Sequence, residues 1–185
     1  MKAIHRWAGL SMALALLSSC KSTFERRDPT GEVFPSVRGT ALAGKEYKLP
    51  EDLAGSPAVL LLGFVMDSQF DIDRWLLGLA QAKADVSIHE VPTIPGLVPG
   101  MFAGYIDEGM RSGIPEGDWA SVITVYGDGG EIVRFTGNEN PRNARVLLLD
   151  AKGKVVYFHD RGYSAGTLLV LLEKIQELKA GAPPP

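Results

Sequence analysis

The chain has 185 residues, a formal net charge of −3 and a hydrophobic content of 45%. This size and composition predict one modest domain with a single core. The basic residues are dispersed, which argues against a nucleic-acid surface. Cys20 is the only cysteine; if it is acylated, the mature chain has no thiol for a disulfide, a nucleophile or a thiolate metal site.

The first nineteen residues predict a bacterial export signal. Lys2, His5 and Arg6 form a short basic region, residues 7–17 form an apolar run too short to span a bilayer, and the sequence LSSC then ends at Cys20. LSSC resembles the lipobox of bacterial lipoproteins. The resemblance implies cleavage before Cys20 and a thioether-linked lipid, with palmitate as an acyl chain, on that residue. An ordinary secretory signal with a chance cysteine is the alternative.

The resemblance also implies an address in the cell envelope. Lys21, rather than an aspartate, follows the cysteine, and in lipoproteins this points to the periplasmic side of the outer membrane rather than to the inner membrane. Residues 20–31 are polar and predict a lipidated, flexible tether. We expect the Arg26-Arg27 pair to be solvated there, with contact to anionic headgroups as the alternative. The folded domain is expected over residues 32–179, and residues 180–185 are expected to form a disordered tail.

The domain is predicted to start with a hairpin, from extended pieces at Val33 to Val37 and Glu46 to Leu49. Ala58 to Phe64 (AVLLLGF) predicts a fully buried strand because all seven residues are uncharged. The next segment carries apolar residues at helical spacing, namely Ile72, Trp75, Leu76 and Leu79. Ser68 and Asp71 are predicted to cap this helix.

Later segments complete the pattern. Strands are predicted at Asp85 to Val91 and Ser121 to Tyr126, with a short helix around Phe102 to Met110 between them. Glu131 to Thr136 fits either a short helix or a strand. The sequence ARVLLLDAKGKVVYFH predicts a hairpin around a type I turn from Asp150 to Gly153, and Ser164 is a candidate cap for a final amphipathic helix.

This order of elements predicts an α/β domain with a mixed sheet flanked by helices and an N-terminal hairpin extension. The segments AVLLLGF, SVITVYGD and ARVLLLDAKGKVVYFHDRG together resemble a thioredoxin-like fold of the peroxiredoxin type. Peroxiredoxins place a proline, a threonine and the reactive cysteine after the first core strand, where this chain has Val65 to Phe70 with none of the three. Peroxiredoxins also place an arginine six residues before the hairpin aspartate, a position that is Ala144 here. The adjacent Arg145 should point to the other face of its strand. The fold is therefore expected without thiol chemistry.

A second resemblance rests on Ile114-Pro115, on Gly137-Asn138-Glu139-Asn140 and on LLLDAKGKVVYFHDRG. Read together, these segments resemble the mitochondrial ATP synthase assembly-factor family, whose members share this fold without a working thiol pair. The resemblance implies a binding role, as a scaffold that holds a membrane-protein segment or an assembly intermediate. A lipoprotein of the outer membrane could not meet an inner-membrane ATP synthase, so the type of activity is carried over rather than the partner.

Six polar residues are expected to gather at one end of the sheet. These binding candidates are Asn138, Asn140, Arg142, His159, Asp160 and Arg161, although turn chemistry alone also accounts for most of them. No catalytic residue, metal ligand or cofactor is predicted. The sequence therefore favours a membrane-anchored, redox-inactive module that binds or assembles an envelope protein or complex. The alternative is a metal-dependent or thiol-independent relative of thioredoxin-fold oxidoreductases that uses His89 and His159.

Overall fold

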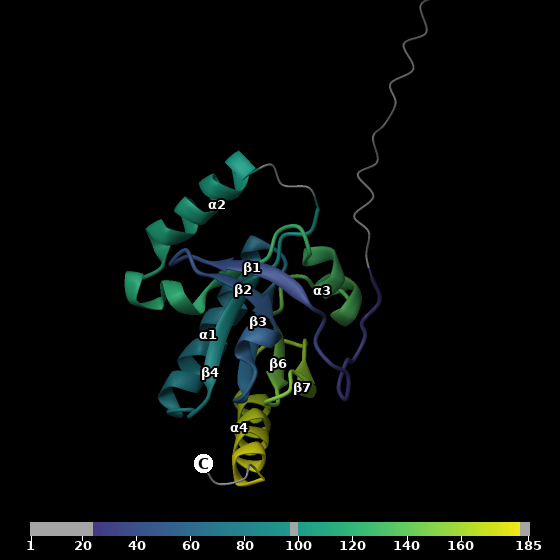
Figure 1. Ribbon diagram of the computed structural model, residues 1–185. Helices are drawn as coiled ribbons and strands as arrows, with labels where there is room; N and C mark the ends of the chain where they lie inside the picture. The colour runs from purple at the N-terminus through teal and green to yellow at the C-terminus, as the bar shows by residue number, and fades with distance from the viewer. Residues whose placement is uncertain (1–23, 97–99, 182–185) are drawn as a thin grey trace, which may run out of the picture.

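The computed structural model describes residues 24–96 and 100–181 (Figure 1). The predicted export signal, Cys20 and the last four residues lie outside these ranges. A hairpin of β1 (Val37–Ala41) and β2 (Glu46–Leu49) comes first. The remaining helices and strands are β3 (Ala58–Gly63), α1 (Gln69–Gln81), β4 (Ser87–Pro92), α2 (Gly100–Gly113), β5 (Ile123–Thr124), α3 (Gly129–Thr136), β6 (Arg145–Leu149), β7 (Val155–His159) and α4 (Ala165–Ala180).

The central sheet has four strands in the order β4-β3-β6-β7. Strand β3 runs parallel to β4 and antiparallel to β6, which in turn pairs antiparallel with β7. A smaller sheet has the order β2-β1-β5, and single bridges from Glu90 to Val122 and from Thr93 to Val125 join it to β4. The predicted mixed sheet and N-terminal hairpin are confirmed.

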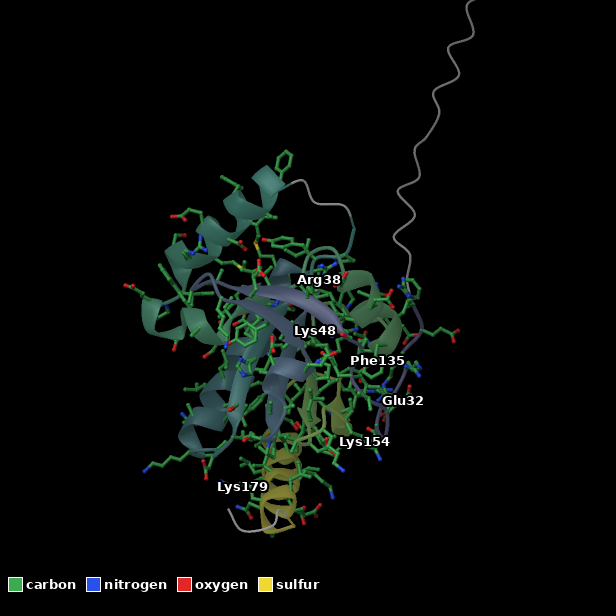
Figure 2. The ribbon with its side chains drawn as sticks, in the orientation of Figure 1. Glu32, Arg38, Lys48, Phe135, Lys154 and Lys179 are labelled. Atoms are coloured by element: carbon green, nitrogen blue, oxygen red, sulfur yellow. The ribbon has the colours of Figure 1, made fainter. Side chains whose placement is uncertain are left out.

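Two apolar layers cover the two faces of the central sheet. On one face, Val59 and Leu61 pack with Trp75 of α1 and Leu171 of α4. On the other, alternate residues of β3 and β6 pack against the small sheet and α3, and they include Leu60, Leu62, Leu147, Leu149, Ile123 and Ile132. All six residues of β3 are buried, because helices or strands cover both of its faces. An ion pair between Lys179 and Asp85 also ties the end of α4 to the loop before β4 (Figure 2).

Several predicted boundaries change in the structure. The first hairpin strand begins at Val37, where the expected piece ended, and β5 is reduced to two residues beside its bridges. The ambiguous segment before Gly137 is helical. The turn closes as expected, since the Gly153 N–H donates to the Asp150 carbonyl, and Ser164 caps α4 through a capping box with Thr167.

The predicted cap of α1 is wrong. The Ser68 hydroxyl donates to the Val65 carbonyl at 2.6 Å and makes no capping bond to the helix. Asp71 is not turned toward the helix start either, because its carboxylate accepts hydrogen bonds from two distant loops. A short 3-10 turn over Met66–Ser68 leads directly into α1 and replaces the expected capping pair.

The segment predicted as a flexible tether is attached to the domain from Phe24 onward. We call residues 24–34 the N-terminal strap; in Figure 1 it is the purple segment beside α3. Its main chain exchanges two hydrogen bonds with Val155, at Gly31 and Glu32, and the Phe34 N–H donates to the Gly153 carbonyl. Glu32 and Lys154 lie on the same side of the molecule (Figure 2). The strap therefore extends the sheet beyond β7, which composition alone did not indicate.

Candidate functional site

One end of the central sheet gathers the loops that carry most of the candidate residues. Strand β3 ends at Gly63 opposite the end of β4, β6 begins beside Leu62, and β7 ends at His159 opposite Val146. In open α/β sheets, ligands bind outside the carboxyl ends of the parallel strands. The turn from Val65 to Ser68 and the start of α1 therefore occupy the favoured position for a site.

Asp71 holds these loops together from the first turn of α1. Its Oδ2 accepts the main-chain N–H of Ala144 at 2.9 Å, before β6, and its Oδ1 accepts the N–H of Tyr163 at 2.8 Å, after β7. The carboxylate is buried, so both N–H groups would otherwise be removed from water without a partner. Asp71 thus joins the start of α1 to two loops at one end of the sheet.

Apolar side chains lie exposed beside this junction. Met66 is 91% exposed, Phe70 is 71% exposed and Val65 is 39% exposed. Phe70 projects outward because the inward stripe of α1 is already filled by Ile72 and Trp75. We call Val65, Met66 and Phe70 the β3–α1 apolar cluster. Three exposed apolar residues within six positions are suited to binding a partner through apolar contact.

The rim of the cluster carries charge. Arg142, a sequence-predicted candidate, reaches across the end of the sheet to form an ion pair with Asp67 at 3.3 Å, next to Met66 in the chain. Both side chains are exposed. An exposed pair of this kind contributes at most about 1 kcal/mol, and either member can therefore turn to a partner at small cost.

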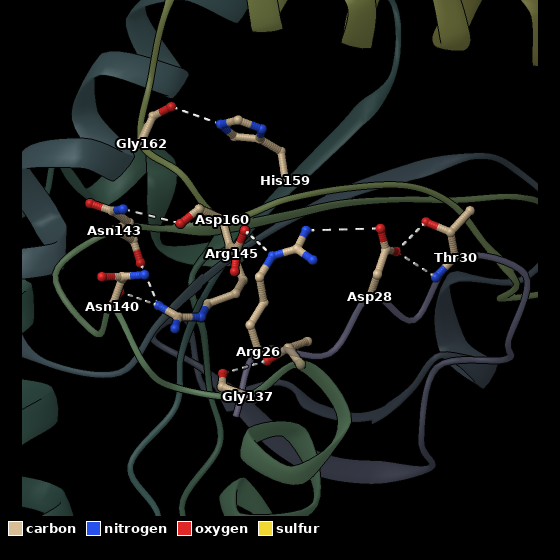
Figure 3. Close-up of polar contacts among 11 residues, drawn as sticks. Arg26, Asp28, Thr30, Gly137, Asn140, Asn143, Arg145, His159, Asp160 and Gly162 are labelled. Atoms are coloured by element: carbon tan, nitrogen blue, oxygen red, sulfur yellow. Dashed lines mark hydrogen bonds and ion pairs between the residues drawn. The ribbon is translucent and has the colours of Figure 1, made fainter. Parts of the chain in front are cut away.

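Asp160 is the centre of a second, buried group. Its carboxylate is only 2% exposed and accepts a hydrogen bond from Arg26 Nε at 2.9 Å (Figure 3). The Arg26 guanidinium also lies over the ring of Phe158, 5.4 Å from its centroid. The expectation of a solvated Arg26 is wrong, because the strap carries this side chain onto a buried carboxylate. The Asp160 carbonyl in turn accepts from the Asn143 amide at 3.1 Å.

Arg145 is buried on the same side of the sheet. Its Nη1 donates to the carbonyls of Asn140 at 2.6 Å and Asn143 at 2.8 Å (Figure 3). The guanidinium lies 4.7 Å from the ring centroid of Phe64. Burial lowers its pKa to about 10, while the nearby Asp160 charge acts in the opposite direction. Arg145 therefore remains cationic at neutral pH and shapes the loop before β6.

The other sequence-predicted candidates divide between two places. The Asn138 side chain accepts the Phe24 N–H at 2.7 Å and so belongs to the strap contact. Asn140 contributes its carbonyl to Arg145. His159 lies on the opposite face of the sheet, where its Nε2 is 2.8 Å from the Gly162 carbonyl and its ring packs on Trp75. Arg161 is exposed. Asn138, Asn140, His159 and Asp160 thus make contacts within the domain, and their role in binding a partner stays a prediction.

His89 and His159 do not share a site. They lie on β4 and β7, the two edge strands of the central sheet, which places them about 14 Å apart across three strand spacings. His89 packs near Tyr47 of the hairpin, whereas His159 faces Trp75 on the other side of the sheet. Within residues 24–96 and 100–181, no three His, Cys, Asp or Glu side chains are grouped as metal ligands.

Glu90 is a buried carboxyl beneath the start of α1. The amide of Gln69 donates to it at 3.4 Å. Burial raises its pKa above the usual value, the Gln69 hydrogen bond acts in the opposite direction, and the neighbouring Asp73 charge adds a smaller upward effect. Burial therefore favours the protonated form of Glu90.

Comparison with known proteins identifies the fold. No protein-family model and no curated protein matches the chain. A SCO1/SenC family lipoprotein from Bacillus anthracis is 17% identical over 84% of this chain and 99% of its own, with a TM-score of 0.54. BsSco, a member of the Sco family of cytochrome c oxidase assembly proteins, is 13% identical over 85% and 99%, with a TM-score of 0.58. The chain has a thioredoxin-like fold.

A thiol peroxidase from Chromobacterium violaceum also matches, with 12% identity over 86% of this chain and 93% of that one and a TM-score of 0.54. The peroxiredoxin-type topology expected from the sequence is consistent with this neighbour. At these identities the likeness establishes the fold and no activity. Some neighbours are bacterial lipoproteins. In the part of the chain that the structure describes, no helix is long and apolar enough to cross a bilayer.

Sequence reasoning missed four residues that define this end of the molecule. The sequence predicts Arg26 in a solvated tether and Asp71 in a helix cap, and it gives no role to Met66 in the turn or to Phe70 at the start of the helix. A signal did exist for Phe70, because it falls outside the i, i+3, i+4 stripe of α1 and must face outward. The contacts of Arg26 and Asp71 span 134 and 73 residues, a separation that local patterns do not encode.

Proposed function

We propose that this protein is a lipid-anchored lipoprotein of the bacterial envelope whose thioredoxin-like domain binds a protein partner without thiol chemistry. The observation that carries the proposal is the exposed β3–α1 apolar cluster at the carboxyl end of β3. Peroxiredoxins hold their cysteine at this place in the chain, and here it holds Val65 to Phe70. This chain therefore presents an exposed apolar surface at the position where peroxiredoxins carry their nucleophile.

The charged rim gives this surface selectivity. The exposed pair of Arg142 and Asp67 borders Met66, so a partner can bury apolar contacts against the cluster and meet one positive and one negative group beside it. Apolar anchors surrounded by polar groups are typical of protein–protein interfaces. Because Asp71 fixes the surrounding loops, the surface is preformed rather than assembled on binding.

The neighbours support the class of role. One is a bacterial lipoprotein and another belongs to a family of assembly proteins. Lipidation at Cys20 and residence at the outer membrane remain part of the proposal. The rival reading, in which His89 and His159 form a metal-dependent site, lacks geometric support because the two residues lie on opposite edges and opposite faces of the sheet.

The test is cross-linking in intact host membranes, followed by mass spectrometry of what the lipidated protein captures. A Met66→Ser/Phe70→Ser variant removes the cluster; a Leu77→Ser/Leu169→Ser variant is the matched control, since those side chains are also exposed and apolar but lie elsewhere. Each buried apolar side chain is worth about 1.5–3 kcal/mol, so capture of the partner should fall at least about tenfold in the first variant only. Equal capture by both variants would overturn the proposal.

A further inference from the structure

The direction of the strap places its beginning at the same end of the sheet as the β3–α1 apolar cluster. Glu32 pairs with Val155 near the start of β7, and Arg26 pairs with Asp160 just after the end of β7. The strap therefore runs antiparallel to β7, toward the end of the sheet where β3 also ends. The chain therefore enters the domain at the same end of the sheet as the cluster rather than at the opposite end.

The contact at this entry is close and specific. Phe24 and Asn138 exchange two hydrogen bonds, of 2.7 and 3.0 Å. A Cβ at Gly137 would collide with the carbonyl oxygen of Glu25, and Gly137 has a φ of +73°. Both its conformation and the space beside it therefore require glycine. The strap main chain therefore packs directly against Gly137 and is held in place there.

Docking of the strap shortens the connection to the predicted anchor. Four Cα steps separate Cys20 from Phe24, which span at most about 14 Å even when fully extended. A free tether up to Glu32 would span about 40 Å. A domain of this size has a radius of gyration of about 15 Å. An anchor attached by 14 Å of chain therefore holds the strap end of the domain at the membrane and prevents its turning away.

We propose that the docked strap holds the β3–α1 apolar cluster toward the bilayer, so that the partner bound there presents its binding segment at the membrane surface. The inference rests on the lipid anchor and the binding surface of the proposed function. It adds an orientation to them. Arg142 and Asp67 link the cluster to the loop that follows Gly137, so the anchored end and the binding surface form one continuous region.

The orientation can be measured without a partner. The lipidated protein is reconstituted in vesicles of phosphatidylethanolamine and phosphatidylglycerol that carry an energy-transfer acceptor on their headgroups. A donor dye is placed on Arg74→Cys near the start of α1 or on Gln81→Cys near its end; both positions are exposed. They are two turns apart on one face of the helix, about 10 Å along its axis. The Cys20 sulfur is already occupied by lipid, so only the introduced thiol is labelled.

We expect clearly stronger energy transfer from position 74 than from position 81. A Gly/Ser spacer of about twelve residues between Thr23 and Phe24 leaves every described contact intact but lengthens the connection, and it should reduce this difference. The same spacer after Gly181 is the control and should not. Equal transfer from the two positions, or stronger transfer from position 81, would overturn the inference.

Cross-linking in host membranes tests the partner. The spacer after Thr23 should lower cluster-dependent capture at least about tenfold, because it removes the high effective concentration of the cluster at the membrane surface. The cross-linked peptide of the partner should lie next to a membrane-spanning segment. Cluster-dependent capture that is insensitive to the spacer, or of a partner remote from the bilayer, would reject the inference and leave the proposed function standing. If the protein without the spacer shows no cluster-dependent capture, the proposed function is rejected, while the energy-transfer result still decides the orientation.

Discussion

The Asp71 carboxylate accepts the main-chain N–H of Ala144 at 2.9 Å across 73 residues of sequence. This bond joins the start of α1 to the loop that enters β6. The second oxygen holds Tyr163 after β7. One side chain thus sets the positions of two loops relative to the start of α1, where the β3–α1 apolar cluster lies.

Replacing Asp71 with alanine should lower the free energy of unfolding by about 2–4 kcal/mol, because two shielded N–H groups lose their only acceptor. Urea denaturation of the domain measures this loss. Asp67→Ala is the control, since Asp67 makes only an exposed ion pair with Arg142 and should cost at most about 1 kcal/mol. Equal losses in the two variants would show that the Asp71 bonds contribute little.

The strap should open when Arg26 is replaced by glutamine. Asp160 is buried, and replacing Arg26 removes the guanidinium that donates a hydrogen bond to its carboxylate, which is unfavourable even though the Arg145 charge lies nearby. Hydrogen exchange at the Gly31 and Phe34 amides, both bonded to the β6–β7 hairpin region, should become at least about tenfold faster than in the wild type.

Arg38→Gln is the matched control for this experiment. Its guanidinium is 88% exposed and lies 3.8 Å from Asp128, so its removal should leave exchange in the strap unchanged. Unaltered exchange at Gly31 and Phe34 in the Arg26 variant would mean that the main-chain bonds hold the strap without the ion pair.

The elements recovered from the sequence are those whose residues repeat at a regular period. The uncharged run from Ala58 and the apolar stripe of α1 predict β3 and its covering helix directly, and the Asp150–Gly153 turn predicts the final hairpin. The thioredoxin-like order follows from them. The strap was missed because a polar segment can dock through its main chain and two arginines without any apolar periodicity.

The candidate site was predicted only in part, for a related reason. Asn140 and Asp160 lie at one end of the sheet, but the Asn140 carbonyl accepts from Arg145 and the Asp160 carboxylate accepts from Arg26. The exposed surface beside them is apolar. Sequence patterns tend to assign apolar residues to the core, and the outward placement of Met66 depends on a 3-10 turn that local pattern does not specify.

Glu90 should make stability depend on pH with a predictable sign. Its pKa in the folded protein is raised above 4.5 by burial and by Asp73, so the fold favours the protonated form. Below pH 4.5 the carboxyl is protonated in both states and carries no penalty. As the pH rises above 4.5 the unfolded chain ionises first, and stability falls until the pH passes the raised pKa of the folded state.

A Glu90→Gln variant should lack this fall, because the amide is neutral at every pH and still bonds Gln69. The free energy of unfolding of the variant minus that of the wild type should therefore increase from pH 4.5 toward neutrality, as urea denaturation at successive pH values would measure. Glu51→Gln tests the sign, since hydrogen bonds from its own main chain and from Ser36 lower the pKa of Glu51 below 4.5; for this variant the difference should decrease as the pH rises toward 4.5 and stay constant above it. If this free-energy difference for Glu90→Gln does not change with pH, water or a local rearrangement must solvate the Glu90 carboxylate in the folded protein to the same extent as in the unfolded chain.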